Sequence, residues 1–232
     1  MKQGIYAIAL SAVAINAVAD DWKGKGELGY VLVGGNTESE VLNLGVEFSK
    51  EQGNWSHSSK LTAVKATSND VDSAESYSAG WRSEYKLSDR SYVFGDFRYF
   101  DDKFDSFEEI YTAAMGYGYK VLMREGLTWD LSIGAGYRDT TVELTQEDVS
   151  GVAYLLESDY KHSLTETTEF ENYTRVEFTD ENTFSQNITS LAVSINSALA
   201  LKASHEVRHN SDPTMGFKSV DRITSVNIVY SF

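Results

Sequence analysis

Hydrophobic and polar residues alternate with a period of two through the final segment of the chain. Val226, Ile228, Tyr230 and Phe232 are separated by polar side chains such as Asn227, so an extended segment has one apolar face and one polar face. This alternation predicts a β-strand between two different environments. About a dozen similar segments precede it, and such repetition is typical of an all-β fold, a single transmembrane antiparallel up-and-down β-barrel.

Turn-forming residues divide the chain at regular intervals, and twelve strands fit this division best. An even number of strands places both ends of the barrel chain on the same side, which in bacterial outer-membrane barrels is the periplasmic side. Ten strands is the alternative, because boundaries inferred from sequence carry an error of a few residues. The twelve expected strands cover residues 22–33, 38–51, 54–67, 75–87, 91–102, 108–121, 126–139, 150–161, 166–179, 184–195, 198–209 and 220–232.

The connections between these strands fall into two sets. Short turns, as at the periplasmic end of such barrels, are expected at residues 52–54, 88–89, 124–126 and 196–197. Longer and more charged connections, as at the extracellular end, are expected at residues 67–74, 139–149 and 210–219. Gly34–Thr37 is a tight exception in the second set, where Asn and Gly accept positive φ.

Aromatic residues gather near the ends of the expected strands. At the periplasmic ends they include Trp22, Trp55, Trp129, Tyr160 and Phe170. At the opposite ends they include Tyr30, Tyr77, Tyr99, Tyr137 and Phe178. General β-propensity in a soluble sandwich would not place aromatics at strand ends, whereas the two interfaces of a bilayer favour such belts.

Residues 1–19 predict a secretory signal peptide. Lys2 supplies a positive charge, an apolar run follows, and Ala17–Ala19 is a small-residue cleavage site. The apolar run is too short to span a bilayer. The expected organisation is therefore a signal peptide at 1–19 and a barrel at 20–232, delivered to the outer membrane of a Gram-negative bacterium.

Composition agrees with a barrel and excludes several kinds of chemistry. The chain has no Cys, which excludes thiolate catalysis, Cys metal sites and disulfides. Its single Pro suits long hydrogen-bonded strands. The mean hydropathy of −0.34 would suit a soluble protein, but in a barrel only alternate residues face lipid.

Period two also assigns the charged residues of the strands to the inside. Each Arg or Lys facing lipid near the midplane would cost about 2–4 kcal/mol, whereas inside the barrel it can pair and hydrate. The expected interior is narrow, wet and ion-paired, with 11 acids and 10 bases. These residues are Lys23, Lys25, Glu27, Glu47, Arg82, Glu84, Lys86, Asp96, Arg98, Asp130, Arg138, Glu157, Asp159, Lys161, Glu169, Glu171, Arg175, Glu177, Lys202, Glu206 and Arg208.

The net charge of −15 then arises largely in the loops. One interpretation is a solvated fringe. The other is an acidic collar that concentrates cations, or that binds divalent cations together with lipopolysaccharide. The collar residues are Asp101, Asp102, Asp105, Glu108, Glu147 and Asp148. The sequence contains no basic patch, so it gives no indication of a nucleic-acid partner.

Few residue constellations suggest catalysis or a bound cofactor. His57 and Ser59 share one face of a strand, as a His and a Ser do in outer-membrane phospholipases, but without an evident orienting Asn. His205 and His209 share a face but lie roughly 13 Å apart along a strand, too far to share a metal. The expectation is no catalytic residue, no metal site and no cofactor.

The segment Leu32–Ser39, with its Gly-Gly-Asn-Thr core, resembles the N-terminal signature of the YdiY-like family of salt-induced outer-membrane proteins, a domain of unknown function. The later hairpins and Tyr230–Phe232 are also similar, so the resemblance covers essentially the whole mature chain. It implies an outer-membrane barrel and supplies no substrate and no catalytic residues.

Three functions compete at this stage. The first is a narrow passive channel for ions or small solutes, with a link to salt or envelope stress. The second is a non-conducting structural or envelope-interaction barrel, closed by its own salt bridges. The third, a lipid hydrolase, has only His57 and Ser59 behind it. Phe232 is expected to act as an assembly signal for the insertion machinery of outer-membrane barrels.

Overall fold

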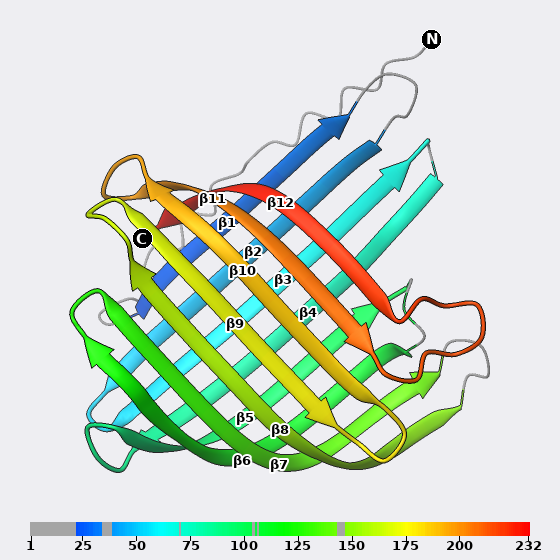
Figure 1. Cartoon of the computed structure of the whole chain (residues 1–232), viewed down its shortest axis with the longest axis horizontal. Helices are drawn as coiled ribbons and strands as arrows, with labels where there is room; N and C mark the ends of the chain where they lie inside the picture. The colour runs from blue at the N-terminus through cyan, green and yellow to red at the C-terminus, as the bar shows by residue number, and fades with distance from the viewer. Residues whose placement is uncertain (1–21, 34–38, 70, 104, 106, 143–146) are drawn as a thin grey trace.

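The computed structural model describes residues 22–33, 39–69, 71–103, 105, 107–142 and 147–232, which form one closed barrel of twelve antiparallel strands (Figure 1). Each strand pairs with its neighbours along the chain, and the last strand pairs with the first. No helix among the described residues is long and apolar enough to cross a membrane. The strands are β1 Trp22–Val33, β2 Ser39–Gln52, β3 Trp55–Ser68, β4 Val71–Lys86, β5 Ser91–Asp102, β6 Phe107–Arg124, β7 Leu127–Val142, β8 Asp148–Ser163, β9 Thr168–Phe178, β10 Thr183–Ser194, β11 Leu199–Asn210 and β12 Val220–Ser231.

The prediction of twelve strands is confirmed, and the alternative of ten is wrong. The start of β4 differs from the expectation, because the strand begins at Val71 instead of residue 75. The long connection expected there is therefore replaced by a tight one, with Asn69 at a φ of 50°. The charges that suggested a loop are paired, since the Lys65 ammonium lies 3.3 Å from the Asp72 carboxylate.

The barrel has two distinct ends. The turn end holds the five turns that follow β2, β4, β6, β8 and β10, together with the start of β1 and the end of β12. The loop end holds the other connections, of which 211–219 is long and 179–182 is short. The connections at the loop end are expected to be longer than those at the turn end. This difference is clear at the β11–β12 loop and does not hold for every hairpin. The tight turn expected at Gly34–Thr37 lies outside the described residues.

Aromatic rings on the outer surface pack across neighbouring strands at both ends. At the turn end, the centroids of Trp55 and Tyr85 are 5.0 Å apart. At the loop end, the rings of Tyr99 and Tyr111 are 4.9 Å apart. Between the belts the outward positions are mostly apolar and exposed, as at Ile133. This surface is the one that a lipid bilayer requires.

The seam between β1 and β12 is short and depends on glycine. Its ladder runs from Lys25 opposite Ser231 to Gly29 opposite Asn227. Beyond the ladder, Gly24 and Phe232 exchange two backbone hydrogen bonds of 2.9 Å each. The Phe232 ring covers Gly24 so closely that any Cβ there would collide with it. Close approach, and not an unusual φ, is the reason for glycine at this position.

Glycines also make room for aromatic side chains on the inner wall. Tyr92 and Phe94 of β5 are buried and lie over Gly118 and Gly116 of β6, where a Cβ would meet their rings. The two rings therefore lie against the wall of the barrel. This arrangement leaves the centre of the barrel free for longer charged side chains.

Candidate functional site

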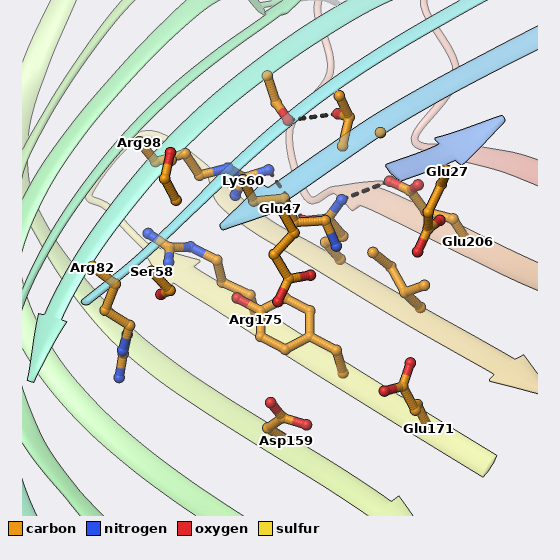
Figure 2. A pocket seen from close by; sticks show the side chains of 18 of the residues that line it. Glu27, Glu47, Ser58, Lys60, Arg82, Arg98, Asp159, Glu171, Arg175 and Glu206 are labelled. Atoms are coloured by element: carbon orange, nitrogen blue, oxygen red, sulfur yellow. Dashed lines mark hydrogen bonds between the residues drawn. The ribbon is translucent and has the colours of Figure 1, made fainter. Parts of the chain in front are cut away.

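A cavity of about 520 Å³ occupies the interior of the barrel (Figure 2). Charged side chains from opposite walls point into it, and Figure 2 shows Arg82, Arg98 and Arg175 among acidic residues such as Glu47 and Glu206. The expected interior residues that line the cavity are Lys25, Glu27, Glu47, Arg82, Glu84, Asp96, Arg98, Asp130, Glu157, Asp159, Lys161, Glu171, Arg175, Lys202, Glu206 and Arg208.

The other expected interior residues lie elsewhere. Arg138 and Glu177 are buried in the packed part of the interior, towards the loop end. Glu169 lies one residue from the start of β9, at the turn end, where Lys23 also lies one residue from the start of β1. Lys86 ends β4 and donates a 2.8 Å hydrogen bond to Asp89, which lowers the pKa of that turn carboxyl.

One charged residue of the cavity is missing from the sequence-based list. Lys60 of β3 lines the cavity and lies opposite Glu47 of β2, which faces inward. Period two from Ser58 to Thr62 could have found it, since both of these residues also line the cavity. With Lys60 included, the cavity lining has a further positively charged side chain near the turn end.

Three arginines form ion pairs of less than 3 Å across the barrel, and we call these pairs the arginine bridges. Arg208 of β11 lies 2.6 Å from Asp102 of β5, six strands away in a ring of twelve. Arg175 of β9 lies 2.9 Å from Asp96 of β5. Arg82 of β4 reaches Glu157 of β8 at 2.7 Å. The first pair joins opposite walls near the loop end, and the other two each join strands that are four apart. Together these pairs narrow the interior.

Arg175 is the centre of this network. Its guanidinium lies 2.7 Å from Glu157, 2.6 Å from Glu177 and 2.9 Å from Asp96, and its side chain is only 3% exposed. Glu157 also accepts hydrogen bonds from Ser132 and Tyr173. Each of the three guanidinium nitrogens of Arg175 therefore donates a hydrogen bond to a carboxylate, and such pairing favours a stable buried ion pair.

Arg138 differs from Arg175, although both are buried. Among the described residues, none forms a hydrogen bond with its guanidinium nitrogens, and its nearest carboxylate oxygen, on Glu177, is 3.9 Å away. The guanidinium lies instead near the rings of Phe107 and Phe184, at 5.6 and 5.9 Å from their centroids. This contrast provides a test of which interior charges stabilise the fold.

Exposure of the charged side chains falls from the turn end towards the loop end. Asp159 and Lys161, near the turn end, are 46% and 45% exposed. Glu177, near the loop end of β9, is 1% exposed. In that region Phe100 and Phe184 pack together, with centroids 6.2 Å apart. Within the described residues, the cavity therefore opens more widely at the turn end than at the loop end.

The expected acidic collar is wrong for several of its residues. Asp101 and Asp102 belong to β5, and Asp102 points inward to Arg208. Asp105 is buried, and its carboxylate accepts hydrogen bonds of 2.8 and 2.9 Å from Asn210. Asp102 and Asp105 point inward because Arg208 and Asn210 of β11 donate hydrogen bonds to them.

The remaining collar residues are placed differently. Asp148 begins β8 and accepts a hydrogen bond from Thr141 across the hairpin. Glu147 is exposed in the β7–β8 connection, and the side chain of Glu108 lies outside the described residues. No cluster of three His, Asp or Glu side chains that could hold a metal ion occurs within the part of the chain that the structure describes.

The His57 and Ser59 pair lies on the outer surface of β3. The Nδ1 atom of His57 is 2.9 Å from the hydroxyl of Ser83 on β4, and no hydrogen bond joins it to Ser59. The Ser83 hydroxyl also accepts a hydrogen bond from Trp81. The His57 ring stacks on Trp55, 5.8 Å between centroids. These contacts make His57 part of the aromatic belt at the turn end.

A closed barrel of twelve antiparallel strands, apolar outside and charged inside, is the architecture of bacterial outer-membrane β-barrels. Solved barrels of this class are similar to the chain. The translocator domain of the autotransporter NalP from Neisseria meningitidis has a TM-score of 0.50 at 12% identity, covering 94% of this chain and 90% of that one. The NanC porin has a TM-score of 0.52 at 12% identity, covering 91% and 98%.

The chain belongs to the DUF481 family, described as proteins of unknown function, whose model matches residues 26–232. It is 27% identical over 234 residues to the uncharacterized protein YdiY of Escherichia coli (strain K12), covering 94% of this chain and 92% of that protein. The resemblance stated on residues 32–39 and 230–232 is therefore confirmed. The fold places the protein among outer-membrane barrels, and the family assigns it no substrate.

Proposed function

We propose that this protein is a narrow passive channel for ions and small solutes across the outer membrane. The observation that carries the proposal is the length of the charged cavity. It extends from Lys25, the fourth residue of β1, to Arg208, the tenth residue of β11. A solute that enters at the turn end therefore meets a polar lining along more than half of the wall.

The path past the arginine bridges runs along the wall formed by β12 and β1–β4. The lining there consists of small polar side chains, such as Asn43, Thr62, Ser78 and Ser225. They hydrogen-bond along the wall, with Thr62 2.6 Å from Ser78 and Asn43 3.3 Å from Ser225. Small side chains leave space beside the bridges, and this space is the proposed constriction of the channel.

The bridges also suggest how salt acts on the channel. Their ion pairs hold opposite walls together, and ions that enter the cavity compete with them. The Debye length falls from about 8 Å near physiological salt to about 3 Å at 1 M. Conductance is therefore expected to rise more steeply with salt than the conductivity of the bulk solution.

Conductance of the purified, refolded protein in planar bilayers tests the proposal. The informative variant is the double substitution Asp102→Asn with Arg208→Gln, which removes both charges of one bridge. Glu206 loses its contact with Arg208 and keeps the hydrogen bond from the Gln186 amide. Wild type should give small unitary currents and the double variant severalfold larger ones. The control is Lys65→Gln with Asp72→Asn, which removes an exposed pair outside the cavity and should behave as wild type.

The competing proposal is a closed structural barrel, and the burial of charged side chains in the interior favours it. Arg175 and Glu177 are almost inaccessible, and Phe100 packs on Phe184 towards the loop end. Such a barrel would carry no ionic current at any salt concentration, in wild type and in the double variant alike. Silence of both proteins, in samples shown to be folded, would therefore replace the channel by the structural role.

A further inference from the structure

One part of the outer surface carries polar side chains across four neighbouring strands, β9–β12, which lie side by side in Figure 1. Thr189 of β10 lies opposite Asn172 of β9 and His205 of β11, and His205 lies opposite Thr224 of β12. These four residues form one polar row across four strands. Inward residues alternate with them, because Tyr173, Glu206 and Ser225 line the cavity, so the row faces outward.

The row belongs to a hydrogen-bonded network with Thr174 and Asn187. The amide of Asn172 donates to Thr189 at 2.8 Å and to Asn187 at 3.4 Å. The amide of Asn187 donates to Thr174 at 2.7 Å and to Asn172 at 3.4 Å. We call these six residues, Asn172, Thr174, Asn187, Thr189, His205 and Thr224, the polar face.

The polar face lies at membrane depth. In β9, Asn172 and Thr174 are flanked on the same face by the aromatic residues Phe170 and Phe178. Asn172 is four residues from the start of β9, and Thr189 is five residues from the end of β10. At about 3.3 Å per residue and a tilt of about 40°, both lie roughly 10–13 Å into the bilayer. Lipid headgroups do not reach this depth.

One nitrogen of the polar face has no hydrogen-bond partner among the described residues. The Nδ1 atom of His205 is 2.8 Å from the hydroxyl of Thr224. An imidazole has a second nitrogen, and no described residue forms a hydrogen bond with Nε2 of this exposed side chain. A polar atom directed into hydrocarbon is unfavourable, and polar residues inside a membrane commonly mark contacts with another polar surface.

We propose that the polar face is the interface at which two copies of this chain associate in the outer membrane. The amides and hydroxyls of this face both donate and accept hydrogen bonds, and the six side chains include no carboxylate and no Lys or Arg. Such a surface is complementary to itself. Two-fold association brings the same patch of both copies together, so Nε2 of His205 meets the partner's amides and hydroxyls.

The size of the face indicates a weak dimer that requires the membrane. Four strands about 4.8 Å apart and an apolar band about 25 Å tall offer on the order of 480 Å² per copy. A standard interface between soluble proteins buries about 800 Å² per partner. The test therefore belongs in native outer membranes or lipid vesicles, because strong detergent would separate the copies.

Cysteine crosslinking is the direct experiment, since the chain has no Cys of its own. Ala203→Cys places a thiol on the outer surface of β11, next to the polar face. Ala79→Cys is the matched control on β4, six strands from β10. A short membrane-permeant bis-maleimide should join two copies of the Ala203→Cys protein and leave the Ala79→Cys protein monomeric.

Removal of the polar face completes the test. In the Ala203→Cys background, Asn172→Leu with Asn187→Leu should reduce the crosslinked dimer to the level of the Ala79→Cys control. Heat-modifiable mobility shows that this variant is folded, and Thr189→Val provides a milder variant that should also reduce the dimer. The proposal is overturned by absence of the Ala203→Cys dimer, by unchanged crosslinking after the Leu substitutions, or by crosslinking to a different protein instead.

Discussion

Arg175 and Arg138 are both 3% exposed, yet their replacement by methionine should affect stability very differently. Methionine is apolar and unbranched, so each substitution removes the charge while filling part of the space. At Arg175 it leaves Glu177 and Asp96 without their shortest cationic contacts, and it removes one of the two 2.7 Å contacts of Glu157. At Arg138 it removes a guanidinium whose nitrogens make no hydrogen bond.

The expected magnitudes follow from what each substitution leaves behind. Breaking a buried ion pair from one side costs about 3–5 kcal/mol. The lower limit applies to Arg175→Met, because Glu157 keeps Arg82 and Glu177 keeps Arg98 at 3.4 Å. Arg138→Met should change the free energy of unfolding by about 1 kcal/mol or less, since a weak contact with aromatic rings is lost and a desolvated charge is removed. A difference of about 2–3 kcal/mol between the two variants corresponds to roughly 30- to 140-fold in the folding equilibrium.

Reversible urea unfolding in lipid vesicles, followed by the fluorescence of the four tryptophans, provides the measurement. Arg175→Lys is the matched control: it keeps a positive charge but cannot make the forked contacts, and it should lie between wild type and Arg175→Met. Equal loss of stability in the two methionine variants would refute the reasoning. It would mean that burial of a charge, and not its hydrogen bonding, determines its contribution.

Three further predictions concern closure, orientation and processing of the barrel. Gly24→Val should impair assembly about as strongly as deletion of Phe232, because either change disrupts the contact between β1 and β12. The measurement is the heat-modifiable, folded fraction of each variant in outer membranes. Normal assembly of both variants would contradict the prediction. For orientation, an impermeant thiol reagent applied to intact cells should label Asp212→Cys in the long loop and miss Asp89→Cys in the turn end. The same exported protein should begin at Asp20, which N-terminal sequencing can check.

The sequence by itself determined the number of strands, their order and which side of each strand faces inward. These properties are local, because turn residues and period-two alternation act over a few positions. Within a strand, one residue known to face inward therefore fixes which of its neighbours also face inward, as Ser58 and Thr62 do for Lys60. Charge alone was a poor guide to loops: Asp72 and Asp102 belong to strands, since each has a cationic partner on the wall or across it.

Only the tertiary structure decided which inward charges meet, and which outward residues share a face. Arg208 and Asp102 are 106 residues apart in the chain and 2.6 Å apart in the barrel. Their contact depends on ring closure and on the stagger of all twelve strands, which no local pattern encodes. The same closure aligns Asn172, Thr189 and His205 into one row on the outer surface. Within its own strand, none of these residues indicates a polar face. The face exists only because the register of the paired strands places them side by side.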